Sequence, residues 1–76
     1  MSEHRNTCFA LARWCLDECN QSPVTTHRVW LWMRHNRPDD IDSWDISLYD
    51  ARRTLQALSW LGEAREISPD WWQVAG

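Results

Sequence analysis

Hydrophobic positions recur at three- and four-residue intervals along most of this chain, most regularly toward its C-terminal end. Within the stretch ISLYDARRTLQALSWLG, the recurring positions are Leu48, Ala51, Leu55 and Leu58. This spacing places side chains on one face of an α-helix, and an apolar face of that kind is normally buried. The pattern predicts a helix over about residues 47–61 whose leucine face contributes to the core.

The residues that flank this stretch indicate where the helix starts and stops. Ser47 followed three residues later by Asp50 forms a capping-box pattern, in which the hydroxyl and the carboxylate satisfy amides of the first turn. Gly62 follows the periodic leucines and suits the left-handed residue that closes a helix. Beyond it, two short β-prone segments are separated by the turn sequence Ser-Pro-Asp, which predicts a hairpin over about residues 64–74.

A second periodic stretch lies near the N-terminus and predicts a helix over about residues 7–20, with Asn6 or Thr7 as its N-cap. Residues 1–6 are polar and are expected to be frayed. Projected at about 100° per residue, one arc of this helix is apolar. Its members are Cys8, Phe9, Leu11, Ala12, Cys15, Leu16 and Cys19. Trp14 falls at the edge of the arc, which predicts a half-covered side chain.

A third helix is predicted over about residues 25–36, between a polar break and a proline that must end it. Thr25 or Thr26 suits its N-cap. The residues expected on its core face are Val29, Trp30 and Met33. Leu31 and Trp32 point elsewhere, so this helix is expected to show an apolar face to something besides the core.

Size and composition limit the chain to one small domain, residues 1–76. The seven tryptophans are expected to supply much of its core, since each can bury roughly 150–250 Å². No run of about 18 apolar residues and no leader pattern is present, so we expect neither a membrane span nor secretion. Three cysteines on one predicted helix favour a reducing compartment over a disulfide framework, and therefore the cytoplasm.

The elements from residue 46 to residue 74 follow a recognisable order: a leucine-rich helix closed by Leu-Gly, a strand, a short tip and a strand containing Trp-x-Val. This order resembles the second half of a winged helix-turn-helix domain. With the two preceding helices added, the resemblance covers most of the chain. It implies a mainly α fold of three helices with a small β-hairpin, in which residues 47–61 form the recognition helix and the hairpin is the wing.

The resemblance also implies a function and a set of contacts. Arg53 and Gln56 have side chains that read guanine and adenine edges in the major groove, and Tyr49 can reach a phosphate. The implied DNA contacts are Ser47, Tyr49, Arg52, Arg53 and Gln56 in the recognition helix, Thr26 and Arg28 at the start of the preceding helix, and Arg65 in the wing. The expected function is a module that binds double-stranded DNA or regulates transcription, as a homodimer or beside a larger partner.

A simpler interpretation of Arg52 and Arg53 is a solvated helix face, paired with Asp45 or Asp50. The net charge of −3 is unfavourable for DNA binding, because Lys and Arg supply most of the non-specific affinity for phosphates. The chain has no lysine, so its eight permanently basic side chains are all arginines. These two properties favour a partner other than DNA.

The alternative function is therefore a non-enzymatic protein interaction module or inhibitor, of the kind made by phages and other mobile elements. Tryptophan and arginine dominate the hot spots of protein interfaces, and clustered acid can imitate nucleic acid. Its surface would consist of exposed apolar side chains and of an aspartate-rich loop over residues 39–45. Those residues are Trp14, Leu31, Trp32, Asp39, Asp40, Asp42 and Asp45.

Metal binding and catalysis find little support in the sequence. The three cysteines share a helical face with His4, and they are interpretable as small buried hydrophobes, as zinc ligands or as a regulatory thiol. One straight helix cannot surround an ion with four ligands, which favours the first interpretation. Glycine occurs only at Gly62 and Gly76, so a phosphate-cradling loop is excluded, and catalytic motifs are missing. We expect neither an enzyme nor a cofactor.

Overall fold

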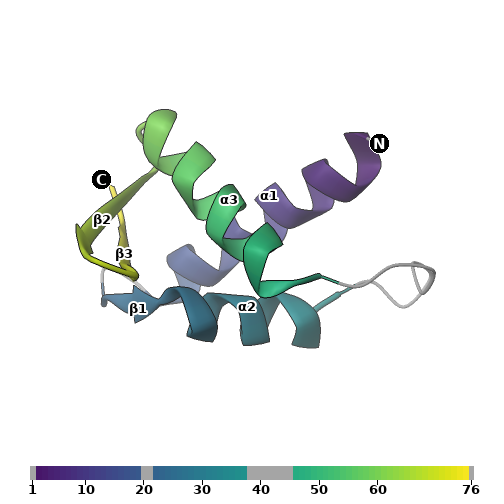
Figure 1. Ribbon diagram of the computed structural model, residues 1–76, viewed down its shortest axis with the longest axis horizontal. Helices are drawn as coiled ribbons and strands as arrows, with labels where there is room; N and C mark the ends of the chain where they lie inside the picture. Colours follow the sequence, from purple (N-terminus) through teal and green to yellow (C-terminus); the bar gives the residue numbers. More distant parts are fainter. Residues whose placement is uncertain (1, 20–21, 38–45, 76) are drawn as a thin grey trace.

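The computed structural model describes residues 2–19, 22–37 and 46–75, with side chains from residue 6 onward. Three helices pack against one another, and a small antiparallel sheet lies at one end of the molecule (Figure 1). The helices are α1 (Ser2–Cys19), α2 (Thr26–His35) and α3 (Leu48–Trp60), and the strands are β1 (Val24–Thr25), β2 (Ala64–Ser68) and β3 (Trp71–Val74). The prediction of a mainly α fold with a small hairpin is confirmed, and a third strand is added to it.

The first helix begins earlier than predicted, at Ser2 instead of about residue 7, so Asn6 and Thr7 are not its N-cap. The prediction of a frayed segment over residues 1–6 is wrong from Ser2 onward, because no proline or glycine interrupts the polar residues before the amphipathic stretch. The predicted core arc is confirmed. Its fully buried members are Cys8, Leu11, Ala12, Cys15 and Leu16.

The short strand β1 was not predicted, because two residues carry no periodicity and its pairing is entirely tertiary. Val24 lies opposite Trp72 and Thr25 opposite Trp71, on β3. Thr25 is also the N-cap of α2, since its hydroxyl accepts a hydrogen bond from the Arg28 backbone N–H at 3.1 Å. The strand therefore leads directly into the helix.

The core face of α2 is confirmed for Val29 and Met33, which are fully buried. Trp30 is half-buried, and its indole N–H donates to the Ile46 carbonyl at 2.7 Å. Trp32 is half-buried too and meets the edge of Trp14, with ring centroids 4.8 Å apart and planes at 84°. The prediction that Trp32 points away from the core is therefore wrong, because it packs between the core and α1.

Both predicted ends of α3 are confirmed. Ser47 Oγ accepts from the Asp50 backbone N–H at 3.0 Å, and the Ser47 N–H donates to the Asp50 carboxylate at 3.0 Å. At the other end Gly62 has a φ of +80° and donates to the Ser59 carbonyl, while the Glu63 N–H reaches back to Leu58 at 2.9 Å. These two bonds form a Schellman closure, which ends the helix.

The leucine face of α3 is buried at Ala51, Leu55 and Leu58 but not at Leu48, which is 39% exposed. The core prediction for Leu48 is wrong. Its angle around the helix lies only roughly 20° from that of the buried Leu55, so its exposure follows from its place as the first residue of α3 and not from its angle.

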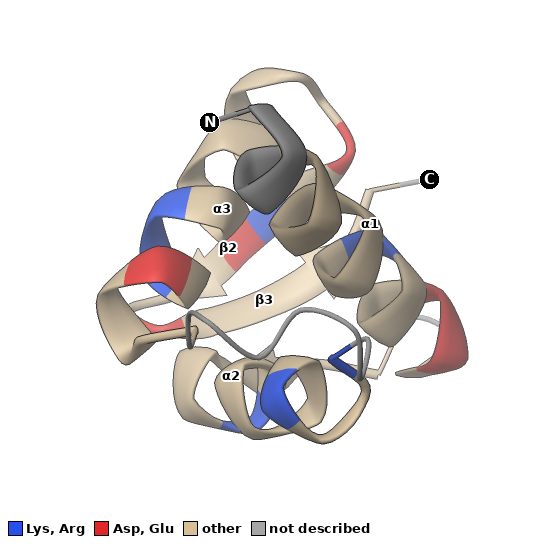
Figure 2. Cartoon of the chain, turned by 90° about the vertical axis from the view of Figure 1, so that its right-hand side faces the viewer, with Lys and Arg blue, Asp and Glu red and all other residues tan. Residues whose placement is uncertain are grey.

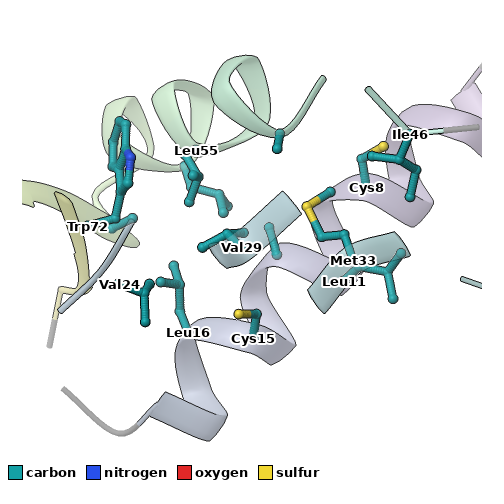
Figure 3. Packing of buried hydrophobic residues seen from close by; sticks show 14 residues of the cluster. Cys8, Leu11, Cys15, Leu16, Val24, Val29, Met33, Ile46, Leu55 and Trp72 are labelled. Carbon is teal, nitrogen blue, oxygen red and sulfur yellow. The ribbon is translucent and has the colours of Figure 1, made fainter. Parts of the chain in front are cut away.

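The sheet has the strand order β1-β3-β2, so β3 is central. The hairpin prediction is confirmed, and β2 carries a bulge between Glu66 and Ser68 that leaves Ile67 without an opposing residue. Trp72 on β3 is 1% exposed and points toward Leu55 in the core (Figure 3). Because Trp14, Trp60 and Trp71 are exposed, the prediction that tryptophans supply much of the core holds only for Trp72 among the fully buried side chains described.

Candidate nucleic-acid interface

The solvent face of α3 carries four side chains suited to recognition. They are Tyr49, Arg53, Gln56 and Trp60, which follow one another at intervals of three or four residues. Tyr49 is 65% exposed and Trp60 is 84% exposed. The Arg53 guanidinium carbon lies 5.7 Å from the Tyr49 ring centroid, so the ring supports the cation from one side. This arrangement leaves a planar cation and an amide side by side on an exposed helix face.

Arg52 lies at the edge of that face nearest the hairpin. Its Nη2 atom is 3.0 Å from the Asp70 Oδ1 atom, and both side chains are about half exposed. An ion pair at this exposure is screened by water and contributes at most about 1 kcal/mol to stability. The pair therefore fixes where the hairpin tip sits beside α3 more than it strengthens the fold.

Thr26, implied as a backbone contact to DNA, is instead part of the interior. It is 3% exposed, and its hydroxyl accepts from the Trp72 indole N–H at 2.7 Å and donates to Asp70 Oδ1 at 3.0 Å. Its backbone N–H donates to the Asp70 carbonyl at 3.0 Å. These bonds use the groups that a phosphate would need, so Thr26 does not belong to the candidate interface.

The remaining implied contacts are spread over different faces. The Ser47 hydroxyl is engaged in the capping box of α3. Burial raises the pKa of the Cys15 thiol on α1 to about 12, Cys19 adds to this rise, and the nearby Arg28 guanidinium opposes it. Arg28 itself is exposed in the first turn of α2. Arg65 is exposed on β2, directly across the hairpin from Gln73.

Charges of both signs occur on α3 and on β2 (Figure 2). Asp50 lies in the first turn of α3 ahead of the two arginines, and Glu66 follows Arg65 on the hairpin. This mixture does not form the continuous basic stripe typical of strong non-specific DNA binding. The face is better suited to a few directed contacts than to broad attraction of phosphates.

The surface predicted for a protein interaction module lies partly within the described residues. Trp14 is 50% exposed and Leu31 is also exposed, whereas Trp32 is half covered. The acidic residues Asp39, Asp40, Asp42 and Asp45 lie outside the described residues.

Sequence reasoning missed the exposed pair Trp60 and Leu61 at the end of α3. The signal was present, because Trp60 lies four positions after Gln56 and seven after Arg53, on the same helical face.

Cys8 and Cys15 lie in the core, as expected for small buried hydrophobes, whereas Cys19 is only partly buried at its edge. Burial raises the pKa of Cys8 to about 11, with the Asp50 charge acting in the same direction and the Thr54 hydroxyl against it. Within the described part of the chain, no group of three or more His, Cys, Asp or Glu side chains is placed to hold a metal ion. Nor is any described helix both long and apolar enough to cross a membrane.

A shallow depression lies between α1, the end of α3 and the end of β3. Leu16, Leu58 and Val74 line its floor, and Arg13 and Glu63 form an ion pair at its rim. The charges of Arg13 and Glu63 are thus paired with each other within the protein itself. Comparison of the chain with protein-family models, with curated proteins and with solved structures gave no match.

Proposed function

We propose that this protein is a small winged helix-turn-helix-like module that binds double-stranded DNA through α3. The observation that carries the proposal is the exposed face of α3, where Arg53 and Gln56 stand beside Tyr49 while the opposite face is buried. The order helix, strand, helix, helix and hairpin supports it, as does the attachment of the hairpin tip beside α3.

In this proposal α3 enters the major groove. Its 13 residues span roughly 20 Å, at about 1.5 Å per residue, which is enough to cross the groove. Arg53 reads guanine through paired hydrogen bonds, Gln56 reads adenine, and Tyr49 donates to a phosphate. Arg65 on the hairpin offers a second phosphate contact, and Thr26, Arg28 and Ser47 contribute none.

The net charge of −3 gives such a module weak affinity for the phosphate backbone. We infer that it regulates transcription as one half of a dimer or alongside a larger DNA-binding protein, because linking two weak contacts raises the effective concentration of each. In such an assembly, this short, acidic module contributes more to the preference for one DNA sequence than to the overall affinity for DNA.

The direct test is anisotropy of a labelled random duplex pool with the purified protein, at about 50 mM and about 200 mM salt. We expect binding at the lower salt that weakens at the higher salt. Arg53→Ala should reduce it by roughly 5- to 150-fold, since a good bidentate base contact contributes roughly 1–3 kcal/mol. Arg28→Ala removes the same charge from α2 instead of α3 and should leave binding within about twofold, which makes it the matched control.

Two outcomes would contradict the proposal. One is the absence of binding at the lower salt, where electrostatic attraction is strongest. The other is an equal loss in Arg53→Ala and Arg28→Ala, which would show attraction by charge alone and no reading face.

The alternative, a protein interaction module, rests on a different observation. Trp60 and Leu61 are both largely exposed and adjacent, and a solvent-facing tryptophan is the residue type most enriched in interface hot spots. If duplex binding is absent, affinity capture with wild-type protein and with Trp60→Ala distinguishes a specific partner, which only the wild type should retain.

A further inference from the structure

The tip of the hairpin is held in place by the backbone of Asp70. This residue has a left-handed φ of +65°. Its carbonyl accepts from the Thr26 N–H, and its own N–H donates to the Glu66 carboxylate, each at 3.0 Å. The Asp70 side chain is therefore presented from a fixed position.

The Asp70 carboxylate contacts two other elements. Its Oδ1 atom accepts a hydrogen bond from the Thr26 hydroxyl on α2 at 3.0 Å and forms an ion pair with Arg52 Nη2 on α3 at 3.0 Å. The Thr26 hydroxyl is itself oriented by the buried indole N–H of Trp72. An anion held by α2 and α3 thus sits directly on the Arg52 guanidinium, at the edge of the α3 face that carries Arg53 and Gln56.

A DNA phosphate would bind the same guanidinium in the same way, because carboxylate and phosphate oxygens are both charge-assisted acceptors for arginine. Stabilisation of the fold does not account for the pair, since both side chains are about half exposed. Its larger effect is on ligand binding, because it neutralises one of the two adjacent arginines of α3.

We propose that Asp70 competes with the DNA backbone for Arg52, and that it thereby keeps binding dependent on the base contacts of Arg53 and Gln56. This inference rests on the proposed function. It assigns the hairpin tip a role in selectivity, because the Asp70 carboxylate occupies Arg52 and so prevents this arginine from binding a DNA phosphate. The Glu66 carboxylate beside it adds to the repulsion of phosphates at the same place.

The test is Asp70→Asn, which removes the charge and keeps the shape. Asparagine tolerates the left-handed φ, and its amide oxygen still accepts from the Thr26 hydroxyl. The released Arg52 should gain one phosphate, which steepens the slope of log affinity against log salt by about 0.9. The gain in affinity over wild type at 50 mM salt should then be about threefold larger than the gain at 200 mM.

Two further variants separate this effect from a change in net charge. Glu63→Gln also removes one negative charge, but its carboxylate pairs with Arg13 on α1, so the salt slope should stay that of wild type. Arg52→Gln combined with Asp70→Asn should lose the gain completely. In the absence of DNA, the side-chain NMR resonance of Arg52 should shift in Asp70→Asn and not in Glu63→Gln.

The outcomes for the two proposals differ. Binding that is the same in wild type and Asp70→Asn at both salts overturns the role of Asp70 and leaves the proposed function standing. A gain that survives removal of Arg52 overturns it as well. Failure of wild type and Asp70→Asn alike to bind any duplex at 50 mM salt overturns both.

Discussion

The hydroxyl of Thr26 is the point at which α2, β3 and the hairpin tip meet. It accepts from the indole of Trp72 and donates to Asp70, and it is buried. A buried hydroxyl that is both donor and acceptor satisfies two groups at once, and a buried donor left without an acceptor costs about 1–3 kcal/mol.

Thr26→Val keeps the volume of this side chain and removes the hydroxyl. We expect a loss of about 1–3 kcal/mol in the free energy of unfolding, because the Trp72 N–H loses its acceptor inside the core. Urea denaturation followed by circular dichroism measures the loss. In a Trp72→Phe background the same change should cost clearly less. Equal costs in the two backgrounds would show that the indole bond is not the cause.

Thr26 and Asp70 could not have been predicted in these roles from the sequence. Their partners lie 46 and 44 residues away along the chain, and side-chain bonds at such separations leave no periodic signal. The exposure of Arg53 and Gln56 could be predicted because a helical face can be read from local spacing alone. The family resemblance placed Thr26 on the DNA, because position at the start of a helix does not reveal that the hairpin tip covers it.

At the scale of elements, the helices and strands that were predicted well have their start and stop signals in the residues directly beside their ends. The capping box at Ser47 and the glycine closure at Gly62 both satisfy helix ends locally, and the hairpin follows from its Pro69-Asp70 turn. The strand β1 was missed because only β3 makes it a strand. The early start of α1 was missed because polar residues extend a helix without changing its periodicity.

Gly62 allows a clean test of helix closure. Its φ is +80°, and a Cβ added there would meet nothing within 4 Å, so Gly62→Ala tests backbone conformation without a steric clash. We expect a loss of about 1 kcal/mol in the free energy of unfolding. Gly62→Asn should lose less, because asparagine adopts this conformation more readily. An alanine variant as stable as wild type in urea would contradict a left-handed closure.

At the scale of the whole molecule, the core is built of aliphatic and sulfur-containing side chains, with Trp72 at one end and Ile46 and Cys8 at the other (Figure 3). Hydrophobic periodicity predicted the buried faces of the helices. Hydrophobic periodicity did not distinguish buried from exposed tryptophans, because tryptophan is counted as apolar on every face of a helix or strand. Trp60 shows the difference: its angle around α3 was readable, but its apolar type suggested burial.

The buried thiols make global stability depend on pH. Burial raises the pKa values of Cys8 and Cys15 from 9.0 to about 11 and about 12. Above about pH 9 the unfolded chain releases thiol protons that the folded chain keeps, so the free energy of unfolding falls as pH rises toward the folded values. Each thiol contributes a slope of at most about 1.4 kcal/mol per pH unit.

Urea unfolding at several pH values between about 8 and about 11 measures this dependence. Cys15→Ala should flatten the decline relative to wild type. Gly62→Ala, which lowers stability without removing a thiol, should run parallel to wild type and serves as the control. A Cys15→Ala profile as steep as that of wild type would show that other groups cause the decline.

The central position of β3 has a consequence for the order in which the protein is assembled. Both neighbouring strands precede it in the chain, so neither has a partner until residues 71–74 have been synthesised. Until then Val24 has no opposing residue and the Thr26 hydroxyl has no indole to accept from. A chain truncated before Trp71 would therefore lack the central strand, so neither β1 nor β2 could pair, and the core would lack the Trp72 indole.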